Sequence, residues 1–342
     1  MIKIGFSIYT GLKDYSKENN LKYLKKGVDK GCEILFTSAH INEASNDYQE
    51  LTDLVTTASE NNLKVIIDVS KPMMEKFVVP PKTYAIRLDY GFTKQEIVEF
   101  SKNHKHKVEL NASTIDERRF QELIDLGLDT TNIRVSFNFY PKPYTGHDID
   151  FVKQRIDYYH SFNIPVLVFI PSHDGFRPPL YQGLPSVEKH RQMSTNLAIE
   201  ELKSLGVDEI AFGDAYVSDE ELEVLAKHKC EHLILPFTFV KGGEKFIDHI
   251  NMEFSVRPDY NNLMLRMTSS RGVNSIEQFN TVERKPGYVT IDNNGFLRYK
   301  GEINIILTDL PKDERVNIIG KVELTKSLVE ALKAGQKFVL EV

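Results

Sequence analysis

Short apolar runs and amphipathic stretches alternate along the first two thirds of the chain. Runs rich in Ile, Val, Leu and Phe predict eight strands, at residues 2–8, 33–37, 63–69, 84–89, 107–111, 132–139, 165–171 and 208–213. Between them, apolar residues recur at helical spacing in segments such as KENNLKYLKKGVDKG and DERRFQELIDLG. Strands alternating with helices indicate βαβ units and a parallel sheet. Eight units in roughly 230 residues fit a (β/α)8 TIM barrel, whose typical size is ~250 residues.

The pattern changes near residue 230, where helical segments become rare. GYVTIDNNGFLRYKGEINIIL predicts two strands flanking Asp-Asn-Asn-Gly, and KVELTKSLVEALKAGQKFVLEV predicts one short helix between strands. We therefore expect a TIM-barrel domain over 1–232 and a smaller, mostly β domain over 233–342. A doubly wound sheet is the alternative for the first part, but it normally has fewer strands and a phosphate-binding GxGxxG segment, which is missing.

Composition and charge narrow the class of protein. The 43 Lys and Arg residues, against 49 Asp and Glu, are scattered along the chain, so no nucleic-acid partner is expected. Cys32 and Cys230 lie far apart without metal-ligand spacing, which fits a reducing cytosol better than a disulfide framework. The apolar runs are too short to cross a membrane, and the opening MIKIGFSIYTG does not resemble a signal peptide. These features predict a cytoplasmic protein.

Nearly every predicted strand ends in a side chain able to form hydrogen bonds. In a TIM barrel the catalytic groups collect at these carboxyl ends and in the loops that follow. Any one such residue could instead cap a turn or a helix, but a purely structural barrel would not need the whole ring. The candidates in chain order are Ser7, Tyr9, Ser38, His40, Asp68, Asp89, Asn111, Asn138, Tyr140, Asp174 and Asp214.

The alternation of side chains along three strands places a second layer below this ring. Arg87, Glu109 and Arg134 point the same way as the strand-end residues two or more positions later. A carboxylate between two guanidiniums is expected to stay ionised. The favoured interpretation is a buried ion-pair network at the barrel floor, and Asp89 and Asn111 above it are better placed for substrate.

The stretch FIPSHDGFRPPLYQGLPSVEKHR, residues 169–191, contains a connection of about sixteen residues rich in Pro and Gly. Loops this long are usually functional or disordered. Ser186 is expected to cap a helix over VEKHRQMSTNLAIEELKSL, and Glu188 in its first turn is explained by the helix dipole as well as by catalysis. Asp174 and Arg177 lie well before that cap, so ligand contact is the better explanation for them.

The sequence lacks the motifs of several other enzyme classes. No HExxH, CxxC, GxSxG or Walker segment occurs, so neither a metal nor a nucleotide cofactor is expected. Chemistry at the rim would therefore come from carboxylates, amides, Tyr and His. Paired carboxylates among neutral donors are what glycoside hydrolysis requires. Enolising phosphosugar chemistry is compatible with the same groups.

Several segments together resemble one known family. GFSIYTG, ILFTSAHI, IIDVS, ELNAST, NFYPKPYTG, the long loop above, AFGDAY and GYVTIDNNGFLRYKGEI occur in the order found in the 6-phospho-N-acetylmuramidases, glycoside hydrolase family 170. The resemblance implies a TIM barrel followed by a cyclophilin-like β domain. It also implies intracellular hydrolysis of a 6-phospho-N-acetylmuramic acid–N-acetylglucosamine disaccharide during cell-wall recycling, without a cofactor.

This substrate class gives each candidate residue an expected role. Asp174, among Pro, Phe and Gly, is predicted to be desolvated and to act as the acid, while Asp89 stays ionised as nucleophile or base. Asp214 and Asn111 would orient the sugar or a water. His173, Arg177 and Arg271, the last from RMTSSRG, are candidates for the phosphate or lactyl carboxylate. A catalytically idle sugar-phosphate sensor and a phosphosugar lyase or isomerase are the alternatives, and a homodimer is a candidate assembly.

Overall fold

The computed structural model describes residues 1–39, 48–272 and 275–342. The chain divides into two compact units, the first made of Met1–Leu202 with Gly206–Lys229 and the second of Lys203–Leu205 with Cys230–Val342.

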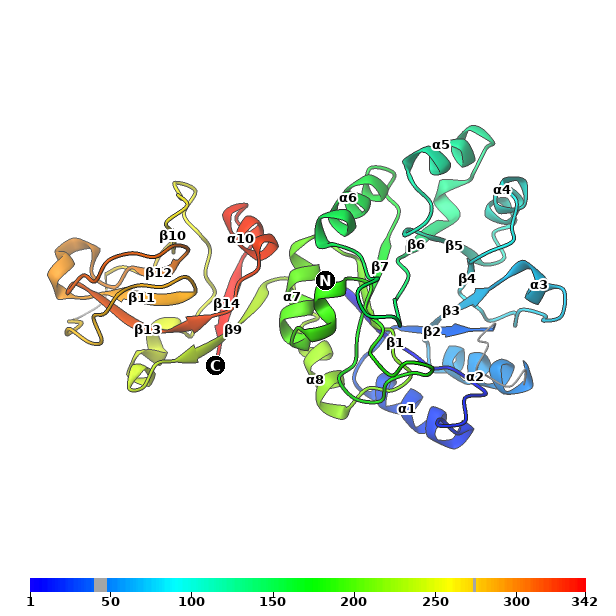
Figure 1. Ribbon diagram of the computed structural model, residues 1–342, viewed down its shortest axis with the longest axis horizontal. Helices are drawn as coiled ribbons and strands as arrows, with labels where there is room; N and C mark the ends of the chain where they lie inside the picture. Colours follow the sequence, from blue (N-terminus) through cyan, green and yellow to red (C-terminus); the bar gives the residue numbers. More distant parts are fainter. Residues whose placement is uncertain (40–47, 273–274) are drawn as a thin grey trace. The chain divides into compact units, whose positions relative to one another are not determined.

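The first unit is a closed barrel of eight parallel strands in sequential order, as predicted (Figure 1). The strands are β1 (Lys3–Ser7), β2 (Ile34–Ser38), β3 (Lys64–Val69), β4 (Ala85–Leu88), β5 (Lys107–Asn111), β6 (Ile133–Ser136), β7 (Val166–Ile170) and β8 (Glu209–Phe212). Register between β1 and β8, with Gly5 opposite Ala211, closes the barrel. All carboxyl ends therefore meet at one rim.

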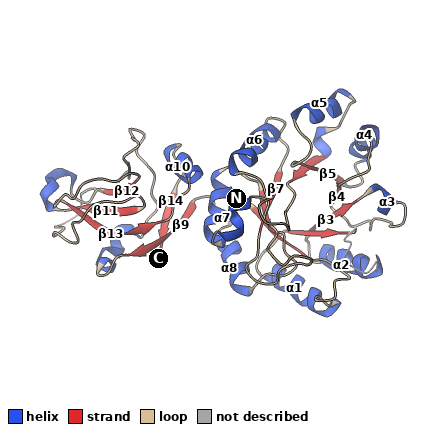
Figure 2. Ribbon diagram, in the orientation of Figure 1, coloured by secondary structure: helices blue, strands red, loops and turns tan. Residues whose placement is uncertain are grey.

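Helices surround the strands, as the blue and red ribbons of Figure 2 show. They are α1 (Lys17–Asp29), α2 (Tyr48–Glu60), α3 (Lys71–Met74), α4 (Lys94–Asn103), α5 (Glu117–Asp125), α6 (Ile149–His160), α7 (Thr195–Ser204) and α8 (Asp219–Lys227), with 3-10 turns η1 (Thr130–Asn132) and η2 (Glu188–Gln192). Helix α3 has only four residues.

The barrel interior is filled by aromatic side chains rather than left open. Phe36 and Phe169 pack edge to face with ring centroids 5.0 Å apart, and Phe139 meets both rings. Tyr9 joins the same cluster and is fully buried. These packed rings form an aromatic base below the polar side chains of the rim.

One predicted helix is wrong in its extent. Instead of a continuous helix after Ser186, the chain forms η2, breaks at Met193, and resumes as α7. Ser186 does not cap it, because its hydroxyl accepts a hydrogen bond from the backbone N–H of Phe169 (3.0 Å). Ser186 therefore attaches the end of the long loop to β7 by a hydrogen bond.

The second unit contains a six-stranded mixed sheet in the order β10-β12-β11-β13-β9-β14. Its elements are β9 (Leu233–Phe239), η3 (Gly243–Phe246), α9 (Ile247–Ile250), β10 (Met264–Arg266), β11 (Tyr288–Asp292), η4 (Asn294–Tyr299), β12 (Ile303–Ile306), β13 (Val316–Val322), α10 (Lys326–Lys333) and β14 (Phe338–Glu341). The predicted pair of strands around Asp-Asn-Asn-Gly is confirmed as antiparallel β11 and β12, with η4 between them. The predicted helix between the last two strands is α10.

Candidate active site

Arg87 occupies the centre of the polar rim. Its guanidinium is buried and donates from Nη1 to Asp68 (2.7 Å) and Asp89 (3.3 Å), and from Nη2 to Asn138 (2.6 Å). Nε donates to the Ser136 hydroxyl at 2.9 Å. Burial alone would lower the pKa of Arg87, but the surrounding carboxylates raise it. One permanent positive charge therefore holds two carboxylates and an amide, and we call these four side chains the Arg87 cluster (Arg87, Asp68, Asp89 and Asn138).

A buried ion-pair network lies below this cluster, as the alternation along the strands predicts. Arg134 Nε donates to Glu109 Oε2 (2.5 Å), and the Arg87 Nε lies 3.9 Å from Glu109 Oε1. Glu109 is thus placed between two guanidiniums. Arg134 also pairs with Glu209, the first residue of β8, which the sequence analysis did not single out. The network closes the barrel floor and supports Arg87 from beneath.

An amide and hydroxyl chain runs outward from the Arg87 cluster. Asn111 donates to the Asn138 side-chain oxygen (3.0 Å), and the backbone N–H of Asn138 donates to the Ser113 hydroxyl (2.8 Å). His147 Nε2 lies 2.8 Å from the Ser113 hydroxyl and 2.9 Å from the Tyr140 hydroxyl. Burial, reinforced by a nearby arginine, lowers the pKa of His147 to about 4. The neutral imidazole can therefore accept a hydrogen bond from a hydroxyl group of this chain.

Asp214 holds the long loop after β7. Its carboxylate accepts backbone N–H bonds from Ser172 (2.9 Å), Leu184 (2.9 Å) and Arg177 (3.3 Å). The side chain is fully buried, and burial raises its pKa to about 6 against the effect of these three donors. Asp214 is therefore the desolvated carboxyl of the rim, and its visible contacts are with the loop backbone.

Further contacts fix the same loop. Glu221, at the start of α8, accepts from the Ser172 hydroxyl and the His173 backbone N–H, both at 2.8 Å. The Tyr15 hydroxyl donates to the carbonyl oxygens of Gly175 (2.9 Å) and Phe176 (2.8 Å). Gly175 has φ +64°, and an added Cβ would lie 2.4 Å from the Tyr216 Cβ, so only glycine fits. The loop is thus an ordered part of the barrel.

Arg177 projects from this loop over the aromatic base. Its guanidinium carbon lies 4.8 Å from the ring centroid of Tyr9 and 5.4 Å from that of Phe139. Nε donates to the Pro178 carbonyl oxygen (3.3 Å), and no carboxylate of the described residues accepts from the guanidinium. Burial raises the pKa of Tyr9 to about 12, and its hydroxyl donates to the Gly213 carbonyl oxygen (2.7 Å). Tyr9 therefore supports Arg177 from below, and Arg177 remains available to an anion.

The desolvation expected for Asp174 is wrong. The residue is exposed, and its Oδ1 accepts from the backbone N–H of Gly175 (2.9 Å). Pro and Phe neighbours in the sequence do not cover it, because the loop turns this side chain toward solvent. His173 is exposed as well, with Nε2 2.9 Å from the Met193 carbonyl oxygen. Both residues lie at the rim, but neither is buried there.

Glu188 joins the loops that follow β6 and β7. It accepts from the backbone N–H groups of Tyr144 (2.8 Å) and Gly146 (2.7 Å) and forms an ion pair with Arg191 (2.7 Å). The hydrogen bonds from Arg191, followed by those from the backbone, lower the pKa of Glu188 to about 2. These contacts explain Glu188 better than a helix-dipole role does, since η2 is a single short 3-10 turn.

Two predicted site residues do not take part in the hydrogen bonds and ion pairs described above. His40 lies outside the described residues. Arg271 belongs to the second unit, where it pairs with Glu302 and stacks over Tyr299 with its guanidinium carbon 4.5 Å from the ring centroid. Glu302 also pairs with Arg266 (2.8 Å), so one carboxylate is shared by two arginines.

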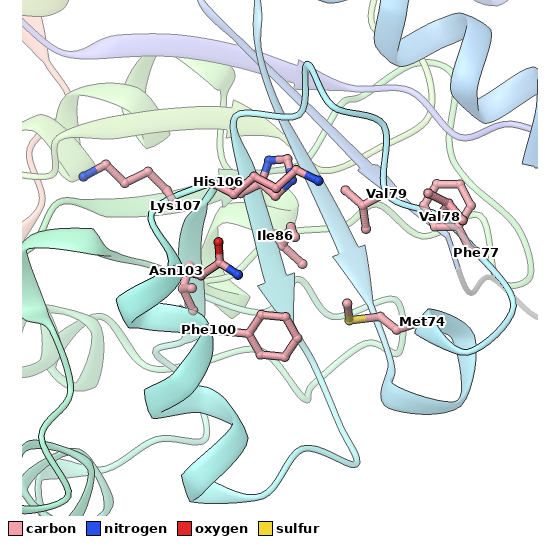
Figure 3. A pocket seen from close by; sticks show the side chains of 11 residues that line it. Met74, Phe77, Val78, Val79, Ile86, Phe100, Asn103, His106 and Lys107 are labelled. Carbon is pink, nitrogen blue, oxygen red and sulfur yellow. The ribbon is translucent and has the colours of Figure 1, made fainter.

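A cavity of about 200 Å³ lies on the flank of the barrel between the segment after α3 and strands β4 and β5 (Figure 3). Its lining includes Met74, Phe77, Ile86, Phe100 and His106, and no carboxylate. Lys107 at the start of β5 lines it, which places it toward the amino ends of the strands. The lack of a carboxylate in its lining and its position toward the amino ends of the strands distinguish this cavity from the site at the rim.

Within 1–39, 48–272 and 275–342, no three His, Cys, Asp or Glu side chains are grouped closely enough to hold a metal ion. In the same part of the chain, no helix has the length and hydropathy needed to cross a membrane.

Comparison with known proteins decides the family. One family model, the N-terminal part of 6-phospho-N-acetylmuramidase, matches residues 4–227, and the model of its C-terminal part matches residues 237–341. The chain belongs to the 6-phospho-N-acetylmuramidase family. The family confirms the predicted function, hydrolysis of a phosphorylated muramyl disaccharide in peptidoglycan recycling, and the predicted glycosidase class.

Solved structures agree with this 6-phospho-N-acetylmuramidase assignment in fold. The crystal structure of an uncharacterized B. cereus protein matches with a TM-score of 0.89 and 27% identity, covering 100% of both chains. A conserved Enterococcus faecalis protein of unknown function matches with a TM-score of 0.73 and 28% identity, covering 99% of this chain and 96% of that one. No curated protein sequence matches the chain.

The rim of this 6-phospho-N-acetylmuramidase contains residues that sequence reasoning missed. Ser113 and His147 connect Asn138 to Tyr140. His147 follows the segment NFYPKPYTG and precedes α6, so its position in the loop after β6 was a usable signal. Asp68 was noticed as a strand end, but its pairing with Arg87 depends on the register of β3 against β4, which places the two residues opposite each other.

Proposed function

We propose that the enzyme hydrolyses its phosphorylated muramyl disaccharide at the Arg87 cluster, with Asp89 as the ionised carboxylate that acts as nucleophile or base. The observation that carries this assignment is the guanidinium that contacts Asp89 from the barrel side at 3.3 Å. A neighbouring positive charge favours the ionised form of a carboxyl group. The Asp89 side chain is also 27% exposed, whereas that of Asp68 is 11% exposed, so Asp89 is the more accessible of the two.

The acid must be both protonated and within reach of the leaving-group oxygen. Asp214 meets the first requirement, because its pKa is raised to about 6, but it is fully buried. Asp174 is exposed on a loop that Asp214 fixes over the rim, which supports contact between its carboxyl group and a bound substrate. We assign the acid to Asp174, desolvated only when substrate covers it, and a positioning role to Asp214.

The remaining polar groups fit the binding of a phosphorylated amino sugar. Asn111, Asn138 and Tyr140 form one connected chain beside Asp89 and supply amide and hydroxyl groups for sugar hydroxyls or a water. Arg177, whose guanidinium has no carboxylate partner among the described residues, suits the phosphate. Its loop follows β7, and loops after strands 7 and 8 often bind phosphate in TIM barrels. The exposed His173 lies in the same loop as a further ligand.

The assignment is tested with two substrates. On the natural disaccharide, release of free N-acetylglucosamine measures hydrolysis and separates it from sensing, elimination or isomerisation. On an activated aryl glycoside, whose leaving group needs no protonation, Asp174→Asn should regain much more of the wild-type rate than Asp89→Asn. Preferential rescue of Asp214→Asn instead would transfer the acid role to Asp214, and near-wild-type activity of Asp89→Asn would remove Asp89 from catalysis.

Two coarser expectations belong to the same proposal. We propose a cytoplasmic location, because the family resemblance implies that the phosphorylated disaccharide is hydrolysed inside the cell. A homodimer is also proposed, and the molecular mass in solution, against 39.3 kDa for one chain, measures it.

A further inference from the structure

A groove of about 520 Å³ opens from the rim between α4 and α5. Asp89 and Asn111, at the carboxyl ends of β4 and β5, line its inner end. Asp89 belongs to the Arg87 cluster, and Asn111 donates a hydrogen bond to Asn138 of that cluster. The groove is therefore continuous with the proposed catalytic centre and large enough for a sugar substituent.

The outer part of the groove carries a net positive charge, because Lys94, Arg118 and Arg119 line it against the single carboxylate of Glu122. The carboxylates of Asp116 and Glu122 both interact electrostatically with Arg118. Lys94 is neutralised by Glu122 at 2.6 Å, and Asp89 is paired with Arg87. Arg119 donates from Nη1 to the Thr114 carbonyl oxygen (3.0 Å), which leaves its charge uncompensated by that contact. The Arg118 guanidinium has neither a hydrogen-bond nor an ion-pair partner within the part of the chain that the structure describes. An anion entering the groove would meet two arginines.

The other walls of the groove are apolar. Phe92 and Ile97 come from the α4 side, and Ile115 and Leu123 from the α5 side. A planar guanidinium binds a carboxylate with two parallel hydrogen bonds, and an apolar wall favours a methyl group next to it. The groove thus has the chemistry to hold a carboxylate on a short apolar stem.

The substrate carries such a group in addition to its phosphate. In 6-phospho-N-acetylmuramic acid the phosphate is on C6, and the lactyl ether on C3 ends in a carboxylate beside a methyl group. The two substituents diverge from the ring and require two cationic positions. Arg177 projects from the loop after β7, over rings from the segments after β1 and β6. The groove follows β4 and β5, across the mouth of the closed barrel.

We propose that the groove between α4 and α5 is the subsite for the lactyl carboxylate, with Arg118 as its principal ligand and Arg119 in support, while Arg177 takes the phosphate. This inference rests on the proposed function, because it places a substituent of that substrate. It assigns Arg118 to specificity: the enzyme would distinguish a muramyl sugar from a glucosamine sugar through this side chain.

The test compares two disaccharides that differ only in the lactyl group, one with 6-phospho-N-acetylmuramic acid and one with 6-phospho-N-acetylglucosamine. Wild type should prefer the first in kcat/KM. Arg118→Ala should reduce that preference roughly ten- to a hundredfold and leave the rate on the lactyl-free substrate unchanged. Arg118→Lys should retain part of the preference, because lysine keeps the positive charge. It should not retain all of it, because lysine cannot form the two parallel hydrogen bonds of a guanidinium. Lys153→Ala, which removes an exposed charge on α6, is the matched control and should change nothing.

Results of two kinds would overturn the inference. One is an undiminished lactyl preference in Arg118→Ala, or an equal loss on both substrates. The other is a loss of discrimination between phosphorylated and unphosphorylated substrates in that variant, which would show that the groove holds the phosphate. If wild type hydrolyses neither disaccharide, the proposed function fails, and calorimetric binding of N-acetylmuramic acid 6-phosphate and N-acetylglucosamine 6-phosphate to the same variants still tests the groove.

Discussion

Replacing Arg87 with methionine removes the charge around which the rim is assembled. The substitution keeps much of the side-chain volume but leaves the largely buried Asp68 carboxylate without its 2.7 Å partner. Removing one partner of a buried ion pair typically costs about 3–5 kcal/mol. Asp68 keeps a 3.3 Å bond from the Ser38 hydroxyl, and the partly exposed Asp89 can be hydrated, so we expect a loss of about 3 kcal/mol. Activity should fall as well, because Asn138 and Asp89 lose the group that orients them.

Urea unfolding followed by far-UV circular dichroism measures the loss, with Lys82→Met as the control. Lys82 pairs with Glu60 on the surface, where both side chains are more than half exposed, so its loss should cost no more than about 1 kcal/mol. Adding Asp68→Asn to Arg87→Met removes the carboxylate charge that Arg87 had balanced and should recover part of the stability. Two outcomes would refute the buried pair as the source of the effect. One is an Arg87→Met variant as stable as the Lys82→Met control. The other is a double variant whose loss in free energy of unfolding equals the sum of the losses in Arg87→Met and Asp68→Asn within ~0.5 kcal/mol.

Two further predictions follow from the rim and the second unit. The pKa of Asp214 is raised from 3.8 to about 6, so the folded state holds its proton more tightly, and this contribution to stability falls by up to about 3 kcal/mol as the pH rises from 3.8 to about 6. The stability difference between wild type and Asp214→Asn should follow that slope, and a flat difference would contradict it. Arg177→Ala should reduce the kcat/KM preference for phosphorylated substrate roughly ten- to a hundredfold. Arg271→Ala should reduce this preference less, since Arg271 already has an ion-pair partner in Glu302. The reverse order would show that Arg271 is the main phosphate ligand.

The barrel could be predicted from the chain because its signals are local. Eight apolar runs separated by amphipathic segments specify strand and helix positions, and parallel βαβ units then force the strand ends to one rim. The helix expected after Ser186 was wrong for a physical reason. The hydroxyl and backbone of Ser186 bond to Phe169 on β7, a contact from outside the local segment, and this outweighs a favourable capping position.

The candidate site was predictable in position but less so in chemistry. Asn111 and Asn138 lie together at the rim, as expected from their strand ends. The environment of each carboxyl group was harder to infer. Proline and phenylalanine around Asp174 suggested burial, whereas the fold exposes that residue and buries Asp214, forty residues further on. Sequence neighbours do not decide desolvation, because the groups that cover a side chain usually come from other loops.

The amino-acid sequence by itself therefore determined the class of fold, the ring of polar residues at the strand ends, the ion-pair floor of Glu109 and Arg134, and the family. Each of these follows from spacing along the chain or from motifs in a fixed order. Only the tertiary structure decided which carboxylates Arg87 binds, which aspartate is desolvated, and that Arg118 and Asp89 line one groove. Charge pairing and burial depend on distances through space, and those exist only after the barrel has closed.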